Sequence, residues 1–224
     1  MATAATATPE YPARLTIEPH YEGRNRLTTF FRIILAIPHL ILVGGGPIAF
    51  GAGGGSFTWG DNSWGFEFGS NAGLIGLVAI VCAIISWFAI LFTRNHPRGL
   101  WDLGRFYLRW RARAVAYTAL LRDNYPPFGD TDYPVDFEID GPPGDRDRLS
   151  VGLRIIFAIP HLIVLAVLSL AWVIVTVIAW FAILFTGNYP RGLYDFSVGV
   201  FRWDMRVWAY MLLLRDEYPP FSLD

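Results

Sequence analysis

Two histidines lie beside prolines inside apolar runs, which read LAIPHLILV at 35–43 and FAIPHLIVL at 157–165. An imidazole can ligate a metal or haem, or carry a proton near neutral pH, so His39 and His161 are candidates for these roles. Each proline also frees a helix carbonyl about one turn upstream, and a neighbouring histidine can help to satisfy such groups. The apolar runs contain no carboxylate to complete a site. We therefore predict a kinked packing point without metal or cofactor; haem or metal ligation is the alternative.

Arginines form the second candidate set. Arg32 and Arg154 precede the two histidines by seven residues, hence on nearly the same helix face. Guanidinium groups bind phosphate and carboxylate, and their long stems reach from apolar surfaces to lipid headgroups. We expect this snorkelling, with a built lipid phosphate or carboxylate site as the alternative. Anionic headgroup contact is also predicted for arginines on a stripe that occurs in the later helix of each copy: Arg109 and Arg113, and Arg202 and Arg206.

A polar turn motif, N-x-P-R-G-L-x-D, occurs at 95–102 and again at 188–195. Its Asn, Pro and Gly shape a turn, and its Asp falls in the first turn of the next helix, where a carboxylate favours the helix dipole. A structural role is predicted for its charged members, Arg98, Asp102, Arg191 and Asp195. The sequence has no HExxH, Walker motif or nucleophile–base set, so we do not expect an enzyme.

These candidates recur because the chain contains two copies of one unit. Residues 24–43 and 146–165 are identical at 12 of 20 positions, and 86–128 and 179–221 at 26 of 43. The offset between the copies falls from 122 to 93 residues, which places an insertion of 29 residues within 44–72. The predicted units are repeat 1 over 11–128, an acidic linker over 129–147 and repeat 2 over 133–221, which overlaps the linker.

Hydropathy indicates a membrane protein: 54% of the 224 residues are hydrophobic. The run at 71–93 carries no charge over 23 residues, enough for a helix to cross a bilayer. The run at 149–186 is too long for one span at 38 residues, so we predict a turn near 169–172. The predicted fold class is an all-α integral membrane protein. Each repeat would contain a transmembrane helical hairpin, 27–48 with 72–93 and 149–168 with 171–186.

A third helix is predicted after each hairpin, over 192–216 in repeat 2, where Asp195, Arg202 and Arg206 share a narrow stripe. An amphipathic helix in the membrane plane keeps these arginines at the headgroups. A spanning helix would place them in the bilayer at about 2.5–3.5 kcal/mol each, so we prefer the in-plane helix and keep the spanning helix as the alternative. Short extended segments are expected before the hairpins, at 13–18 and 135–140.

Charge asymmetry predicts the topology. Neither the 44–72 segment nor the predicted turn near 170 contains Lys or Arg, so the arginine-rich side is expected in the cytoplasm. The two repeats would then be parallel, with a pseudo-twofold axis along the membrane normal and both termini cytoplasmic. We predict a multi-pass protein of the bacterial inner (cytoplasmic) membrane. A net charge of −1 argues against a nucleic-acid partner.

The inserted segment over 44–72 is rich in glycine and carries interleaved aromatic residues. Glycine at this density predicts a loop, and exposed aromatic side chains are residue types that anchor interfaces. Partner contact is predicted for Phe57, Trp59, Trp64, Phe66 and Phe68.

Four stretches, IPHLIVL, WFAILFTGNYPRGLYDF, RWDMRVWAY and LLRDEYPPFSL, resemble the bacterial membrane family called domain of unknown function 4389. The resemblance covers nearly all of both copies. The departures are the glycine-rich insertion and RNH at 94–96, where the second copy reads GNY at 187–189. The resemblance implies a membrane-embedded protein and no particular activity.

Three functions follow as expectations. The first is a non-catalytic membrane scaffold or accessory subunit, bound to anionic membrane lipids and to other membrane protein subunits. The second is a carrier or transporter of lipid or small molecules that uses the repeat interface. The third, an enzyme acting on lipid, has the weakest support. A polar cavity between the repeats would favour the carrier, and a solid interface with an exposed apolar flank would favour the scaffold.

Overall fold

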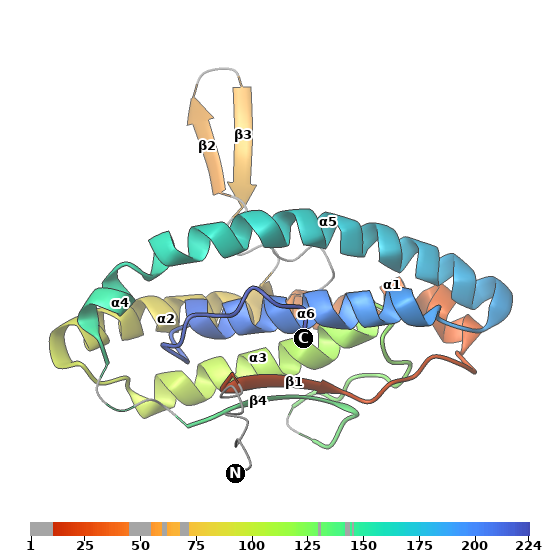
Figure 1. Ribbon diagram of the computed structural model, residues 1–224, viewed down its shortest axis with the longest axis horizontal. Coiled ribbons are helices and arrows are strands. Elements are labelled where there is room, and N and C mark those ends of the chain that lie inside the picture. The colour runs from red at the N-terminus through yellow and green to blue at the C-terminus, as the bar shows by residue number, and fades with distance from the viewer. Residues whose placement is uncertain are drawn as a thin grey trace, which may run out of the picture.

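The computed structural model describes residues 11–44, 55–59, 62–67, 72–129, 131–141, 144 and 146–224. The described chain is mainly helical (Figure 1). Its elements are β1 (Ala13–Ile17), α1 (Arg26–Val43), β2 (Gly55–Trp59), β3 (Asn62–Glu67), α2 (Gly73–Thr93), α3 (Arg98–Thr118), β4 (Val135–Ile139), α4 (Arg148–Gly152), α5 (Arg154–Thr186) and α6 (Arg191–Met211).

The elements form three layers along one long axis. Figure 1 shows α5 on one long side and the β1–β4 sheet on the other, with α3 and α6 between them. Helices α1 and α2 pack on α3, and α5 packs on α6. The sheet covers the opposite side of the middle layer, where β4 contacts α3 and β1 contacts α6. The middle helices are therefore enclosed between apolar helices and a sheet.

The expected extended segments are confirmed as β1 and β4, which pair with each other in antiparallel register. Leu15 lies opposite Phe137, and these two residues are 122 positions apart, the offset between the repeats. Each strand therefore pairs with its own counterpart about a local twofold axis through the centre of the sheet. The buried face carries Ala13, Leu15 and Ile17 against Val135, Phe137 and Ile139, as the alternation predicts.

The predicted turn near 169–172 is wrong, because α5 continues from Arg154 to Thr186 without interruption. The residues at this point, Ser-Leu-Ala-Trp, include neither glycine nor proline, so nothing in the local sequence breaks the helical hydrogen bonds. Ser169 and Trp172 are buried on the inner face of the helix. The length of the run and its correspondence to the loop-containing segment of repeat 1 suggested the turn, and α5 accommodates that length by running along the molecule.

Helices α1 and α2 together correspond to α4 and α5. Val43, the last residue of α1, aligns with Leu165, and Gly73, the first residue of α2, aligns with Ala166. Figure 1 shows α1 and α2 following each other along the long axis, not side by side as a hairpin. The junction is tight: a Cβ on Gly73 would lie 2.4 Å from the Gly44 nitrogen. The insertion thus splits one long helix in two.

Helices α3 and α6 are the predicted third helices of the two repeats, and α6 covers Arg191–Met211 where 192–216 was predicted. Their surroundings differ from the predicted exposed amphipathic helix. Tyr107, Arg111 and Tyr117 of α3 are buried, as are Phe201 and Met205 of α6. The cause is the β1–β4 sheet, which joins segments far apart in sequence and covers the polar stripe of both helices. In the described part of the chain, three helices are long and apolar enough to cross a membrane: α1, α2 and α5.

Candidate membrane-facing site

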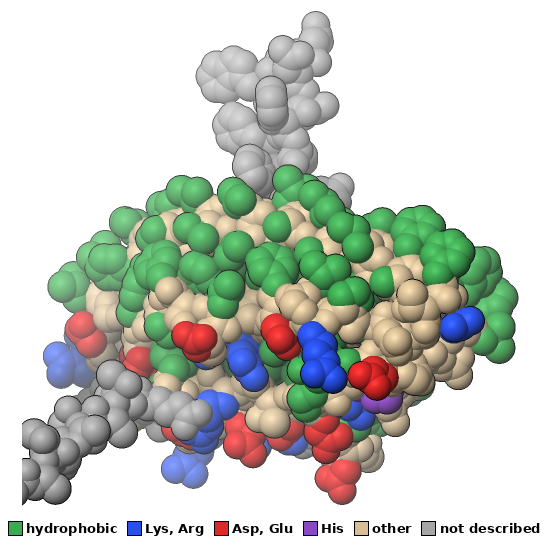
Figure 2. Space-filling view, turned by 45° about the vertical axis from the view of Figure 1, so that its right-hand side comes forward, with side chains coloured by type: hydrophobic (Ala, Val, Ile, Leu, Met, Phe, Trp, Pro, Cys, Tyr) green, Lys and Arg blue, Asp and Glu red, His purple; other side chains and the backbone are tan. Residues whose placement is uncertain are grey.

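One face of the molecule is apolar along its full length. Of the 37 large hydrophobic side chains that are exposed in the described chain, eight lie on α1, eight on α2 and thirteen on α5. Figure 2 shows hydrophobic side chains over one half of the visible surface and charged side chains over the other half. An apolar surface of this extent marks a membrane or protein contact.

The helical period separates the two faces of α5. Ala158, His161 and Leu165 point inward and are fully buried, whereas Ile159 and Ile163 are exposed at 48% and 63%. In the most apolar 18-residue windows of α1, α2 and α5, only 22–28% of the residues are buried. Each of these helices therefore packs on the protein through one narrow stripe, and the rest of its surface is exposed.

Both predicted histidines accept a hydrogen bond from tryptophan. The indole Nε1–H of Trp110 donates to Nδ1 of His39 at 3.2 Å, and that of Trp203 donates to Nδ1 of His161 at 3.0 Å. An indole N–H only donates, so Nδ1 must accept, and in the neutral ring the proton resides on Nε2. The interaction joins the long apolar helix of each repeat to its buried third helix.

The aromatic residues of the YPPF segments complete each histidine environment. Phe128 stacks on His39 with ring centroids 4.5 Å apart, and Phe221 stacks on His161 at 4.0 Å. The hydroxyl of Tyr218 donates to the Phe157 carbonyl at 3.1 Å, three residues before the proline in α5. The packing point predicted from Pro-His thus has aromatic partners and a donor to Nδ1 in the protein, whereas Nε2 of His161 is buried and makes no hydrogen bond within the described residues. Within the described residues, no group of three His, Cys, Asp or Glu side chains could hold a metal ion.

Arg32 and Arg154 are buried, each 2% exposed, and they bind protein groups. The Arg32 guanidinium contacts the Asp123 carboxylate at 2.6 Å and donates to the Arg122 carbonyl at 2.8 Å. Arg154 makes the equivalent contacts with Asp216 and with the Arg215 carbonyl. This placement differs from the headgroup contact expected from the sequence, because the loop after each third helix brings a carboxylate to the guanidinium.

Two further arginines share these carboxylates, and neither was among the predicted site residues. Arg24 lies 3.0 Å from Asp123, and Arg146 contacts Asp216 at 2.5 Å. Burial would raise the pKa of Asp123, but Arg24, the Asn25 backbone N–H and Arg32 outweigh it and lower that pKa. Burial also lowers the pKa of Arg24 to about 10. The repeated R-x-R-L before each long helix was the available signal.

The arginines of the predicted stripe also have protein partners. Nε of Arg109 lies 3.0 Å from Asp136 of β4, and Arg113 donates to the Gly129 carbonyl at 2.8 Å. Arg206 donates to the carbonyls of Ser222 and Asp224 near the end of the chain, and Arg202 is partly exposed. Headgroup contact, expected for all four, is replaced at Arg109 and Arg113 by contacts with the β4 strand and the loop before it.

The turn motif joins the long helix to the third helix in each repeat, as predicted. The expected position of its Asp in the first helical turn is wrong, because α3 and α6 begin at the Arg of the motif, four residues before the Asp. Pro97 and Pro190 occupy the N-cap positions of α3 and α6. Arg98 and Asp102 are exposed. Arg191 lies 3.4 Å from Glu22, with both side chains 74% exposed, and Asp195 accepts a hydrogen bond from Tyr21 at 3.3 Å. The second motif therefore also holds the segment that precedes α1.

Trp87 and Trp180 each donate a hydrogen bond to a backbone carbonyl of the other repeat, at equivalent positions. Trp87 of repeat 1 donates to the Val151 carbonyl at 3.0 Å, and Trp180 of repeat 2 donates to the Thr29 carbonyl at 3.1 Å. Trp87 and Trp180 are equivalent positions of the two repeats, 93 residues apart. Their acceptors, Thr29 and Val151, are also equivalent positions, 122 residues apart. Each long helix thus anchors the start of the other.

The sequence of the chain matches one family pattern over residues 68–129 and 148–222. The family is described as "Domain of unknown function (DUF4389)". The chain belongs to the DUF4389 family. Searches of curated proteins and of solved structures return no match.

The two DUF4389 matches cover corresponding parts of the repeats. The first contains α2 and α3, and the second contains α4, α5 and α6. The His161–Trp203–Phe221 packing point lies entirely within the second match. In repeat 1, His39 precedes the match, because the insertion separates α1 from the rest of the DUF4389 unit.

The predicted partner contacts lie in the insertion. Phe57 and Trp59 belong to β2, and Trp64 and Phe66 belong to β3, a pair of strands joined in an antiparallel hairpin. The side chains of these four residues, and the whole of Phe68, lie outside the part of the chain that the structure describes. Their contact with a partner stays a prediction.

Proposed function

We propose that this DUF4389 protein is a non-catalytic membrane scaffold or accessory subunit that docks to a larger membrane protein complex. The observation that carries the proposal is the exposed apolar face of α1, α2 and α5. It exceeds what monomeric soluble proteins leave in contact with water. A bilayer is the environment that such a face requires, and a protein held there presents its remaining surfaces to neighbours.

The packed contact between the repeats favours a scaffold over a carrier. Within repeat 2, Trp172 of α5 is 2% exposed and lies against Phe201 of α6, with ring centroids 5.5 Å apart. The contacts between the repeats include those of α3 with α6. The rings of Tyr107 in α3 and Trp208 in α6 have their centroids 6.3 Å apart. The Cζ atom of Arg111 lies 4.8 Å from the centroid of the Trp208 ring. Large side chains thus fill the centre where a carrier would need to hold its cargo.

We further propose that the protein resides in a bacterial inner membrane, with both termini in the cytoplasm and with anionic lipids around it. The support is the absence of Lys and Arg from 44–72, against eighteen arginines elsewhere. The inserted segment is the proposed partner contact, since the second repeat forms its long helix without any equivalent.

A deletion of 44–72 tests the scaffold proposal. It joins Val43 to Gly73, as Leu165 is joined to Ala166 in α5, so the helices need no new loop. We expect normal membrane insertion and loss of co-purifying subunits on native gels in mild detergent. A matched variant keeps the length and replaces with Ser the aromatic residues Phe57, Trp59, Trp64, Phe66 and Phe68. Migration of the full chain without any partner, or an unchanged complex in both variants, would contradict the proposal.

A further inference from the structure

We propose that α1, α2 and α5 lie flat in a single leaflet of the bilayer, with their apolar face among the acyl chains and the β1–β4 sheet in water. The occupant of the apolar face is thus a lipid monolayer. This inference deepens the proposed function and rests on its membrane location. It leaves the sheet side for protein partners, whereas the β2–β3 hairpin extends from the same side of the molecule as α5 (Figure 1).

The length of α5 is the first argument. Its 33 residues extend for about 50 Å at the rise of an α-helix, whereas the hydrocarbon core of a bilayer is about 30 Å thick. To fit that thickness, α5 would need a tilt of more than about 50°, beyond the range of about 0–40° for transmembrane helices. A helix in the membrane plane has no such limit.

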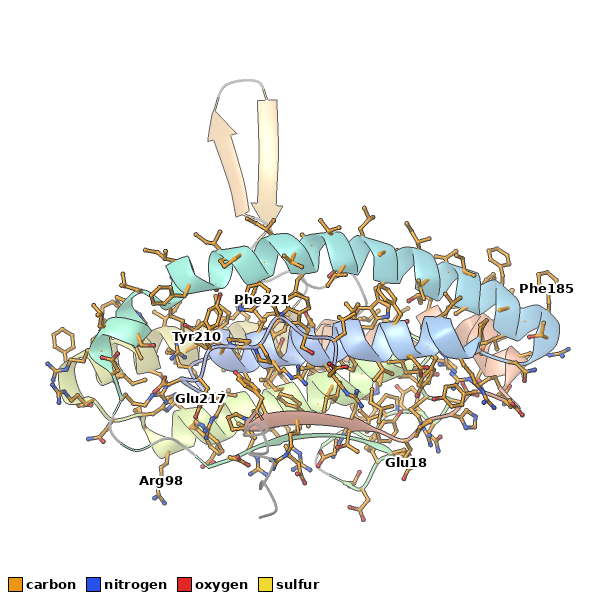
Figure 3. All side chains as sticks on the ribbon, viewed as in Figure 1. Glu18, Arg98, Phe185, Tyr210, Glu217 and Phe221 are labelled. Carbon is orange, nitrogen blue, oxygen red and sulfur yellow. The ribbon has the colours of Figure 1, made fainter. Side chains whose placement is uncertain are left out.

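The second argument is that the apolar surface follows the long axis on one side. Ile155, Ile163, Leu170, Ile178 and Phe185 are 66%, 63%, 65%, 50% and 77% exposed, from one end of α5 to the other. A spanning protein instead carries an apolar belt that surrounds it and ends in polar caps. Figure 3 shows Phe185 at one end of α5, pointing away from the other helices.

The third argument is the polar side, which extends along the same axis. Arg14 of β1 lies 3.1 Å from Asp140 and 4.0 Å from Glu138, and these side chains are 37–65% exposed. The sheet has only two strands in the described chain, so each strand leaves one edge unpaired. A spanning orientation of α5 would place these groups at hydrocarbon depth. Charges there cost about 2.5–3.5 kcal/mol each, and open sheet edges do not occur in lipid.

The fourth argument is the distribution of charge around the apolar face. Among the eighteen arginines, those that are exposed all lie at the ends of helices: Arg26, Arg94, Arg98, Arg148 and Arg191. The exposed charges of the sheet and the neighbouring loops are instead carboxylates, including Glu18, Glu138, Asp140 and Glu217. Anionic headgroups attract basic residues by about 1 kcal/mol each. Arg98 points toward the sheet side (Figure 3), so the match to an anionic monolayer at the rim of the face rests on Arg26, Arg94, Arg148 and Arg191.

Labelling from one side of a membrane tests the orientation. The full chain with Cys82→Ala receives one cysteine, at Gly144 or Gly192, which precede and follow α5 and have open space around them. Asp140→Cys on the sheet side is the aqueous control. Each protein is added to vesicles of phosphatidylcholine and phosphatidylglycerol and treated with an impermeant maleimide. We expect complete labelling of all three without lysis. A requirement for lysis at either glycine position would show that α5 crosses the bilayer.

A depth measurement separates lipid from a second copy as the occupant. Fluorophores on single cysteines at Ile155, Leu170 and Phe185 are quenched with brominated lipids. Because α5 is bowed (Figure 1), we expect strong acyl-chain quenching at all three positions with Leu170 somewhat deeper, whereas a spanning α5 would put Ile155 and Phe185 at the two headgroup regions and leave only Leu170 strongly quenched. Weak quenching at Leu170 together with a disulfide between two Leu170→Cys chains would show that a second copy covers the face. Loss of the partner complex would leave these profiles unchanged, and failure of the chain to float with vesicles would overturn both proposals.

Discussion

Arg111 and Asp204 occupy the same position of the two repeats, 93 residues apart, and interact in the core of the protein. Both are buried, at 0% and 4% exposure, on the contacting helices α3 and α6. A twofold arrangement of identical repeats would bring two like charges together near its axis. Because one repeat has Arg and the other has Asp at this position, the two side chains attract each other instead of repelling. This difference is visible when the sequences of the two repeats are aligned.

The Arg111–Asp204 pair predicts a pH-dependent stability. Burial raises the pKa of Asp204 from 3.8 to about 7, although Arg111 acts to lower it. A raised pKa means that the native state holds the proton more tightly, so the free energy of unfolding decreases as the pH rises from about 4 to about 7. Asp204→Asn should lack this decrease. Unfolding in detergent across this range measures the difference between the two proteins, and parallel curves would contradict the prediction.

Removal of the Asp123 carboxylate should strongly destabilise the protein. Asp123→Asn leaves Arg24 and Arg32 buried without their counter-charge, a loss of about 3–5 kcal/mol in the free energy of unfolding. Because the native pKa of Asp123 is lowered, its stabilisation is present above the ordinary pKa of 3.8 and is lost as the pH falls through the native value. Asp102→Asn, at an exposed position, is the control and should have little effect. Equal stability of both variants would refute the buried ion pair.

Substitutions at His161 should separate its hydrogen bond from its packing. His161→Phe keeps an aromatic ring beside Phe221 but leaves the buried Trp203 N–H without its acceptor, at a cost of about 1–3 kcal/mol. His161→Asn supplies a carbonyl acceptor and should restore part of that loss. Trp203 fluorescence and thermal unfolding report both effects. Higher stability of the Phe variant than of the Asn variant would show that packing dominates.

The junction of α1 and α2 predicts the behaviour of the glycine that begins α2. Gly73 has φ +69°, and a Cβ there would lie 2.4 Å from the Gly44 nitrogen, so Gly73→Ala should destabilise the full chain. In the chain that lacks 44–72, the same position lies inside a continuous helix, where alanine stabilises by about 0.5–1 kcal/mol relative to glycine. Thermal unfolding of the four proteins tests this reversal of sign. The same sign in both backgrounds would mean that the helices do not fuse.

The sequence by itself determined the local elements and their repetition. The uncharged run at 71–93 predicted α2 (Gly73–Thr93), and the turn motif predicted a helix from residue 192, one residue after the observed start of α6 at Arg191. Alternation with flanking prolines predicted β1 and β4. These signals are local, because hydrophobic periodicity, prolines and turn residues act within a few positions along the chain.

Only the tertiary structure decided what the polar residues contact. Arg32 reaches Asp123 over 91 residues, and Trp180 reaches Thr29 over 151, distances in sequence that no periodicity encodes. Hydropathy also showed that the 149–186 run is apolar, but it did not show whether the helix turns back or continues along the molecule. The continuous α5 runs along the molecule because α6 packs against its length and the helix contains no residue that would turn it back. Partners and direction depend on packing between distant segments, which a single sequence does not specify.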